Sequence, residues 1–311
     1  MGERRISEDM ENRKNKGEWI GLLTGICGTS IFGFSFMFSR ISMTVTSPEN
    51  LLMWRFLFAV LFMTILIVIL KFTRHAEGWL GFDLKGKSLK PLLWLGFIQP
   101  VFYFTCESNG INLTNATMSG VMLALVPIIA IVIGVFYLHE KTNGAQVAFS
   151  VLSILGVIVM TLCERADGGI HMLGMVFLCG AVSAGAYFNA FSRKIAEEYT
   201  PLERTYVMMV EGAVVFTAAA LIRGKADPAA LRYHEFQISI LYLSLLSSIV
   251  AFLGINMATS RLSVAKVSAL SNITTVLSMF AGVIFLGEPF TLLSFTASVI
   301  ILIGVIGVQK T

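Results

Sequence analysis

Charged residues are scarce in this chain of 311 residues: Asp, Glu, Lys and Arg make up 14% of it, whereas hydrophobic residues make up 56%. An ordinary soluble domain carries roughly a quarter charged residues. A water-soluble globule of this size could not hide so much apolar surface, and no polar segment is long enough to fold as a separate catalytic domain. The composition therefore argues against a soluble enzyme and indicates a membrane protein.

The residue patterns of common catalytic sites are also absent. All four histidines lie in loops or at the ends of apolar runs, and the sequence has no H-E-x-x-H, G-x-S-x-G or P-loop pattern. The four cysteines form no C-x-x-C pair and are most simply small packing residues. The basic residues flank apolar runs and do not form one patch, which argues against nucleic-acid binding. We therefore expect no enzyme activity, metal site, cofactor or ATP-driven pump in this chain.

Long apolar runs divide the chain. One helical span takes about 20 apolar residues, and these runs are apolar on every side, which disfavours the alternating pattern of a membrane β-barrel. We predict an all-α polytopic membrane protein with ten transmembrane helices. They are expected at 19–39, 49–71, 91–110, 115–138, 145–163, 171–191, 203–222, 237–259, 264–287 and 291–308.

The basic residues predict an orientation. Lys and Arg are concentrated in the N-terminal tail and in the alternate connections that lie on the same side of the membrane as that tail. Because positively charged segments stay in the cytoplasm, we expect a multi-pass protein of the cytoplasmic membrane with both termini inside the cell. Residues 1–18 then form a polar cytoplasmic tail, and the first apolar run is retained as a span, because it lacks the features of a cleavable signal peptide.

The two halves of the chain resemble each other. Residues 21–41 align with 174–194 at an offset of 153, and Pro48 then falls on Pro201; after the 72–90 connection the offset becomes 148. We predict one repeat at 19–165 and a second at 166–311. Each holds five spans, and since five is odd, the repeats enter the membrane from opposite sides. Inverted repeats of this kind are typical of secondary transporters. The alternative is a non-transporting scaffold or receptor built on the same inverted repeat.

Three short motifs add to this pattern. They are Pro48 with Trp54-Arg55, the stretch from Asn115-Ala116 to Pro127, and Leu286-Gly287-Glu288-Pro289. With the ten runs in two halves, they resemble the EamA-like family of the drug/metabolite transporter superfamily. The resemblance implies a ten-helix carrier that moves amino acids, related metabolites or drugs by alternating access. It also implies a central cavity lined by the first, third, fourth, sixth, eighth and ninth spans. The small multidrug relatives use a carboxylate in their first span; here neither the first nor the sixth span has one, so their proton exchange is not carried over.

Only three charged residues lie clearly inside the predicted spans: Arg55, Glu107 and Glu211. A charge there is costly unless it meets a partner or water, which makes these residues functional candidates. Gln99, Tyr103 and Glu107 follow an i, i+4 spacing and are expected on one helix face, where they could bind an ammonium group or a planar ring. Glu107 could form an ion pair with Arg55 or contact the solute directly. The two roles are compatible.

Two roles are considered for Glu211. It is either a neutral carboxyl hydrogen-bonded to a neighbour or a site of proton coupling. Four further polar residues inside spans are candidates for solute contact: Tyr187, Asn189, Asn256 and Asn272. Glu140 and Glu288 recur at matching helix ends and are expected to cap the helices that follow them. The expected partners are a small organic solute, the lipid bilayer and protons as a candidate coupling ion, with the chain a monomer or weak homodimer.

Overall fold

The computed structural model describes residues 2–73, 78–138, 143–166, 171–288 and 291–310. These residues are helical with short connections, and none of them forms a strand. The structure thus confirms the all-helical prediction for the described part of the chain. Glu140 lies outside the described residues.

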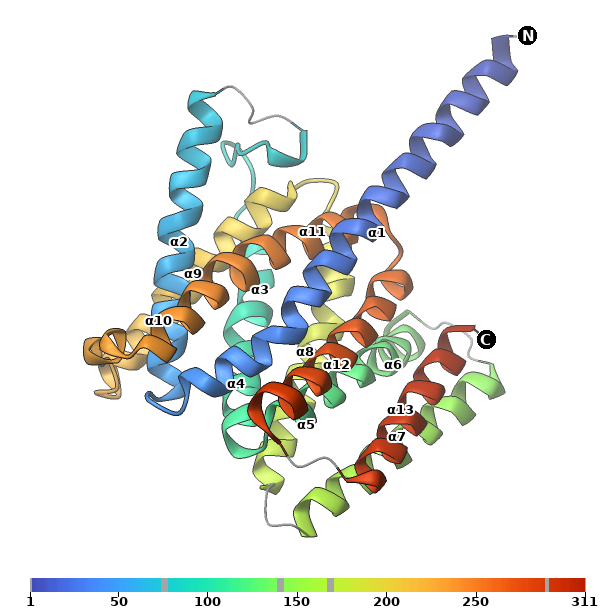
Figure 1. Cartoon of the computed structure of the whole chain (residues 1–311). Helices are drawn as coiled ribbons and strands as arrows, with labels where there is room; N and C mark the ends of the chain where they lie inside the picture. The colour runs from blue at the N-terminus through green and yellow to red at the C-terminus, as the bar shows by residue number, and fades with distance from the viewer. Residues whose placement is uncertain (1, 74–77, 139–142, 167–170, 289–290, 311) are drawn as a thin grey trace.

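Helices occupy every one of the predicted ranges (Figure 1). Seven ranges are unbroken helices: α1 (Gly2–Ser42), α2 (Pro48–Phe72), α7 (Gly144–Ala166), α8 (Met172–Lys194), α9 (Pro201–Ile222), α12 (Val264–Leu286) and α13 (Leu292–Lys310). Three ranges are built from consecutive pieces: α3 (Lys90–Gly96), η2 (Phe97–Phe102) and α4 (Tyr103–Leu113); α5 (Ala116–Met122), η3 (Leu123–Leu125) and α6 (Val126–Leu138); α10 (His234–Leu241), η5 (Tyr242–Ala251) and α11 (Phe252–Arg261). The short helices η1 (Gly78–Leu80) and η4 (Pro228–Arg232) lie in the two long connections.

Within the described residues, six helices are long and apolar enough to cross a membrane. They are Gly17–Ser42, Pro48–Phe72, Met172–Lys194, Pro201–Ile222, His234–Arg261 and Lys266–Leu286. Three shorter apolar helices, Ala116–Ala130, Gly144–Val159 and Phe295–Gly307, accompany them. The chain is therefore a multi-pass membrane protein. Helix α1 begins at Gly2, so the segment predicted as a polar tail continues the first span as a helix that projects from the bundle (Figure 1).

The third predicted span is interrupted at Gln99. This residue has extended backbone angles (φ −146°, ψ 112°) inside η2, and the following Pro100 has no N–H to donate to a helical hydrogen bond. Interruptions of this kind occur in membrane proteins where the backbone is surrounded by protein. Gln99 is buried in agreement with this.

The helices pack in corresponding pairs. Helix α7 lies along α13 at one edge of the molecule, and α2 lies along α9 at the other (Figure 1). Between these edges, α1 packs on α11 and α12, while α4 packs on α8. Phenylalanines form the centre of the largest core cluster, in which Phe56, Phe104, Phe188 and Phe252 are at most 2% exposed.

Glu288 binds the N-terminus of α5, in the other half of the chain. Its Oε1 accepts a hydrogen bond from the backbone N–H of Ala116 at 2.8 Å, and its Oε2 accepts from the N–H and hydroxyl of Thr117 at 2.8 and 2.6 Å. A carboxylate there satisfies helix N–H groups that have no partner within the helix. Glu288 is thus a helix cap, and the helix that it is seen to cap is α5, across the fold.

Candidate functional site

A cavity of about 80 Å³ lies at the centre of the bundle. One buried water needs about 10–15 Å³ of such space, so the cavity has room for several waters or part of a small solute. It is lined by Thr29, Phe32 and Phe36 of α1; Gln99 of η2; Tyr103, Phe104 and Glu107 of α4; Leu123 of η3 and Val126 of α6; Gly185, Phe188 and Asn189 of α8; Phe252 and Ile255 of α11; and Val267, Ser271 and Thr274 of α12. These elements belong to the six helical ranges that the family resemblance implied.

Four of the predicted polar residues meet in this cavity: Gln99, Tyr103, Glu107 and Asn189. The Tyr103 hydroxyl donates a hydrogen bond to Oε1 of Glu107 at 3.1 Å, and both side chains are buried. Since the two residues are four apart in the unbroken helix α4, the predicted i, i+4 arrangement holds for this pair. Gln99 reaches the same cavity from the interrupted backbone of η2.

The side-chain amides of Gln99 and Asn189 differ in their hydrogen bonds within the protein. Oε1 of Gln99 is buried and has no hydrogen-bond partner. Nδ2 of Asn189 donates to the Ser268 hydroxyl at 3.4 Å. A buried polar atom without a partner is unfavourable, so Gln99 is suited to a partner that enters the cavity.

Six of the 17 residues that line the cavity are aromatic. The ring of Phe252 has edge-to-face contacts with Phe32, Phe104 and Phe188 at centroid distances of 5.1, 6.0 and 6.2 Å. All four of these residues line the cavity. Edge-to-face packing fixes the positions of the rings, so the polar groups face a rigid apolar surface.

Arg55 lies beside the cavity wall without lining the cavity. Its Nε donates to the Ser248 hydroxyl at 2.9 Å and its Nη2 to the Ser247 hydroxyl at 2.8 Å. The guanidinium carbon is 4.1 Å from the centroid of the Phe104 ring, a cation–π contact. Arg55 and Glu107 do not form a salt bridge. The ion pairs found among the described residues are Lys87–Glu203, Arg223–Glu49 and Lys266–Glu18. The direct ion pair considered from the sequence is therefore not formed.

Asn256 lies in a different buried network, centred on Arg204. Asn256 accepts a hydrogen bond from the Ser192 hydroxyl at 2.9 Å and donates to the Thr205 hydroxyl at 2.9 Å. Arg204, which is fully buried, donates to the carbonyl oxygens of Ser192 and Asn256 at 2.9 and 2.7 Å and also to the Ser260 hydroxyl. The network joins α8, α9 and α11, and Asn256 is not at the cavity.

Tyr187, Asn272 and Glu211 are also absent from the cavity wall. The Tyr187 hydroxyl accepts a hydrogen bond from the indole Nε1 of Trp94 at 3.3 Å. Oδ1 of Asn272 and Oε2 of Glu211 are buried without a hydrogen-bond partner. The Glu211 carboxyl lies directly against Gly96, where a Cβ would overlap it. Of the predicted residues, the structure thus brings Gln99, Tyr103, Glu107 and Asn189 together.

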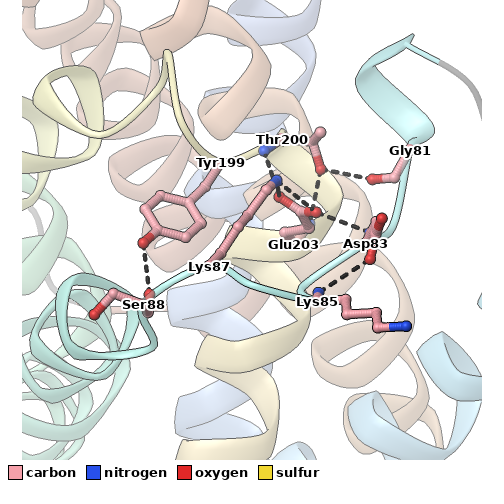
Figure 2. A network of polar contacts seen from close by, with 8 residues as sticks. All are labelled: Gly81, Asp83, Lys85, Lys87, Ser88, Tyr199, Thr200 and Glu203. Carbon is pink, nitrogen blue, oxygen red and sulfur yellow. Dashed lines mark hydrogen bonds and ion pairs between the residues drawn. The ribbon is translucent and has the colours of Figure 1, made fainter.

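A second polar network ties the connection between α2 and α3 to the start of α9 (Figure 2). Glu203, which is 1% exposed, accepts hydrogen bonds from the backbone N–H of Asp83 and of Thr200 at 2.9 Å each. It also forms a salt bridge with Nζ of Lys87 at 2.8 Å. The Tyr199 hydroxyl donates to the carbonyl oxygen of Ser88 at 2.5 Å. Glu203 and Arg204 are not among the candidates named from the sequence, because they are the first two residues of the predicted span 203–222, and a charged residue at the end of a span is ordinarily close to water.

Comparison with known proteins identifies the family. The profile of the EamA-like transporter family matches residues 19–162 and, a second time, residues 172–309. The chain belongs to the EamA-like transporter family. It is accordingly a membrane transporter and not an enzyme, as the missing catalytic patterns indicated.

Named transporters align with two thirds or more of the chain. The uncharacterized transporter YcxC of Bacillus subtilis is 28% identical over 92% of this chain and 91% of its own length. An uncharacterized transporter of Archaeoglobus fulgidus is 23% identical over 93% and 97%. A probable amino-acid metabolite efflux pump of Escherichia coli is 28% identical over 68% and 72%. A solved protein structure with 16% sequence identity superposes with a TM-score of 0.63 over 92% of this chain and 95% of that chain, which shows a common fold.

Proposed function

We propose that this protein is a secondary transporter that moves small organic solutes across the cytoplasmic membrane by alternating access. The observation that carries the proposal is the central cavity, where a buried carboxylate, Glu107, lies among aromatic rings contributed by helices of both halves. Buried ionisable groups inside membrane proteins mark solute and ion pathways. The relatives named as amino-acid metabolite efflux pumps make amino acids and their derivatives the first solutes to examine.

The proposed architecture is two inverted five-helix repeats, 19–165 and 166–311, with residues 1–18 and both termini in the cytoplasm. One family profile matches each half. Arginines at aligned positions also make aligned contacts: Arg40 donates to the carbonyl oxygens of Ile111 and Asn112, and Arg193 donates to those of Thr259 and Ser260. The donors are 153 residues apart and the acceptors 148 apart, which are the two offsets read from the sequence. The cavity lies within one chain, so a monomer or weak homodimer suffices.

Within this proposal, Gln99, Tyr103, Glu107 and Asn189 contact the solute. Arg55 supports the wall through Phe104 and the two serines of η5. Glu211 is the candidate for proton coupling, because its carboxyl oxygen Oε2 is buried without a partner in a membrane-spanning helix.

The test is transport by purified protein in proteoliposomes. Vesicles loaded with unlabelled solute are diluted into labelled solute, and counterflow is measured over a panel of amino acids and amines, with and without a pH gradient. We expect counterflow of at least one organic solute, and its loss in Glu107→Gln. Flux of an inorganic ion without any organic solute would overturn the proposal. Binding of a solute without counterflow would favour the scaffold or receptor alternative.

The coupling role of Glu211 has its own readout. If Glu211 couples protons, Glu211→Gln keeps solute exchange but loses the effect of the pH gradient on net uptake. An unchanged response to the gradient would assign Glu211 a structural role.

A further inference from the structure

We infer that the solute is a small amine, cationic at neutral pH, with an aromatic or branched apolar body and no free carboxylate. This deepens the proposed function, because it rests on the central cavity being the solute site. It also separates this transporter from one that prefers free amino acids. Three features of the cavity support this solute: its charge, its hydrogen-bonding groups and its aromatic residues.

The cavity is lined by one formally charged side chain. Glu107 supplies a carboxylate, and no Lys, Arg or His belongs to the described residues that line the cavity. The nearby cation, Arg55, is held outside by Ser247 and Ser248 and contacts the ring of Phe104. Arg55 interacts electrostatically with Glu107 from behind the wall, but it does not line the cavity. An ammonium group in the cavity would therefore contact an opposite charge directly, whereas a carboxylate would contact a like charge and no cationic side chain of the wall.

The hydroxyl donors of the wall are already used within the protein. Tyr103 donates to Glu107, Thr274 donates to the carbonyl oxygen of Thr29, and Ser271 donates to that of Ser268. The acceptor Oε1 of Gln99 is unpartnered. An ammonium group carries only donors, so it can bind both this acceptor and Glu107, whereas a carboxylate could bind only the amide N–H groups of Gln99 and Asn189.

The aromatic wall suits the same chemistry. Phe32, Phe104 and Phe188 surround Phe252 in the cavity wall. Aromatic rings attract organic cations through their π faces and also bury an apolar body. A carboxylate, by contrast, is repelled by the negative faces of aromatic rings. The cavity thus combines one carboxylate with a partly aromatic wall, which favours an amine over the amino acid of the same side chain.

The test compares three probes that share one body: 2-phenylethylamine, L-phenylalaninamide and L-phenylalanine. Binding is measured as the thermal stabilisation of the purified protein in detergent, which avoids passive diffusion of amines through vesicles. We expect the amine and the amide to bind at least about tenfold more tightly than the free amino acid, a difference of about 1.4 kcal/mol. Counterflow of the labelled amino acid and amide then shows whether binding leads to transport.

Two variants locate the effect. Glu107→Gln is expected to weaken binding of the amine at least about tenfold and to abolish the preference over L-phenylalanine. Glu49→Gln is the control, since it removes a carboxylate that lies outside the cavity, in a partly exposed ion pair with Arg223, and should leave the preference unchanged. Gln99→Leu, which keeps the charge of the cavity, should weaken amine binding less than Glu107→Gln does.

The outcomes separate the inference from the proposed function. Equal or tighter binding of L-phenylalanine would overturn the inference, and counterflow of that amino acid would leave the transporter proposal standing. Tight binding of the amine with no counterflow of any solute would support the inference and contradict transport. Failure of all three probes to bind would overturn the inference, and the transport panel would still test the function.

Discussion

Asn50 and Glu203 hold the two long connections of the protein by equivalent hydrogen bonds. Oδ1 of Asn50 accepts from the backbone N–H of Asp227 at 2.9 Å, and Oε1 of Glu203 accepts from that of Asp83 at 2.9 Å. Each acceptor is the third residue of its helix, α2 or α9, and the two are 153 positions apart. At one end the acceptor is a neutral amide and at the other a carboxylate bound to Lys87. Each long connection is therefore attached to the third residue of a helix by a hydrogen bond, in one case to an amide and in the other to a carboxylate.

The first prediction concerns Glu203 and the connection that it binds. Glu203→Ala removes the acceptor for the N–H groups of Asp83 and Thr200 and the partner of Lys87. Leaving these donors unsatisfied should lower the free energy of unfolding by about 2–4 kcal/mol. Unfolding of the protein in detergent measures the loss. Glu49→Gln is the control, because the Glu49–Arg223 pair is more exposed and should contribute about 1 kcal/mol or less. Equal losses in the two variants would contradict the importance of the Glu203 network.

The second prediction concerns pH. Burial raises the pKa of Tyr199 to about 12, and the neighbouring carboxylates of Glu198 and Glu203 act in the same direction. An unfolded tyrosine titrates near pH 10. Because the pKa is raised in the folded protein, the neutral phenol stabilises the fold fully below about pH 10, and this contribution is lost as the pH rises toward 12. Unfolding midpoints measured between pH 9 and 11.5 should fall more steeply in the wild type than in Tyr199→Phe; parallel curves would contradict the prediction.

The third prediction concerns the close contact of α5 with α12. A Cβ at Gly120 would overlap the side chain of Ser278. Gly120→Ala should therefore destabilise the protein by about 1–3 kcal/mol through overpacking. The double variant Gly120→Ala with Ser278→Gly should recover part of this loss, and a double-mutant cycle measures the coupling. Additive effects in that cycle would show that the two positions do not meet.

The fourth prediction concerns the buried cation of α9. Arg204→Met removes the guanidinium donor from the carbonyl oxygens of Ser192 and Asn256, of which the second still accepts from Thr259 and Ser260, and should cost about 2–4 kcal/mol of unfolding free energy. Arg204→Lys should recover only part of the loss, because an ammonium group does not reproduce the planar fork that reaches two helices. Full recovery by lysine would show that charge alone is required. The control Arg223→Met removes an exposed arginine and should have little effect.

The helical ranges were predictable because lipid imposes a one-dimensional requirement, a long apolar run, which can be read directly along the chain. Tyr103 and Glu107 were predictable as neighbours for a similar reason, since i, i+4 spacing on a helix is local. The inverted arrangement of ten spans remains a prediction. It is supported by the double match to one family profile, while six of the described helices meet the criteria of length and hydropathy.

The positions of Asn256, Arg204 and Arg55 were not predictable in this way. Arg204 of α9 donates to the carbonyl oxygen of Asn256 in α11, and Arg55 donates to two serines about 190 positions away in the sequence. Such partners are brought together by packing and have no regular spacing in the sequence. A polar residue inside a span therefore indicated burial with a partner, but not whether that partner is the protein or a solute.

The contact between Glu288 and the first turn of α5 can form only late in the synthesis of the chain. Thr117 and Glu288 are 171 residues apart. Since a chain grows at roughly 5–20 residues per second during synthesis, the first turn of α5 emerges about 10–35 s before the carboxylate that binds it. The N-terminal half alone, released by a stop codon before residue 288, would keep those N–H groups without this partner. A split gene should therefore yield stable protein only when both fragments are synthesised in the same cell.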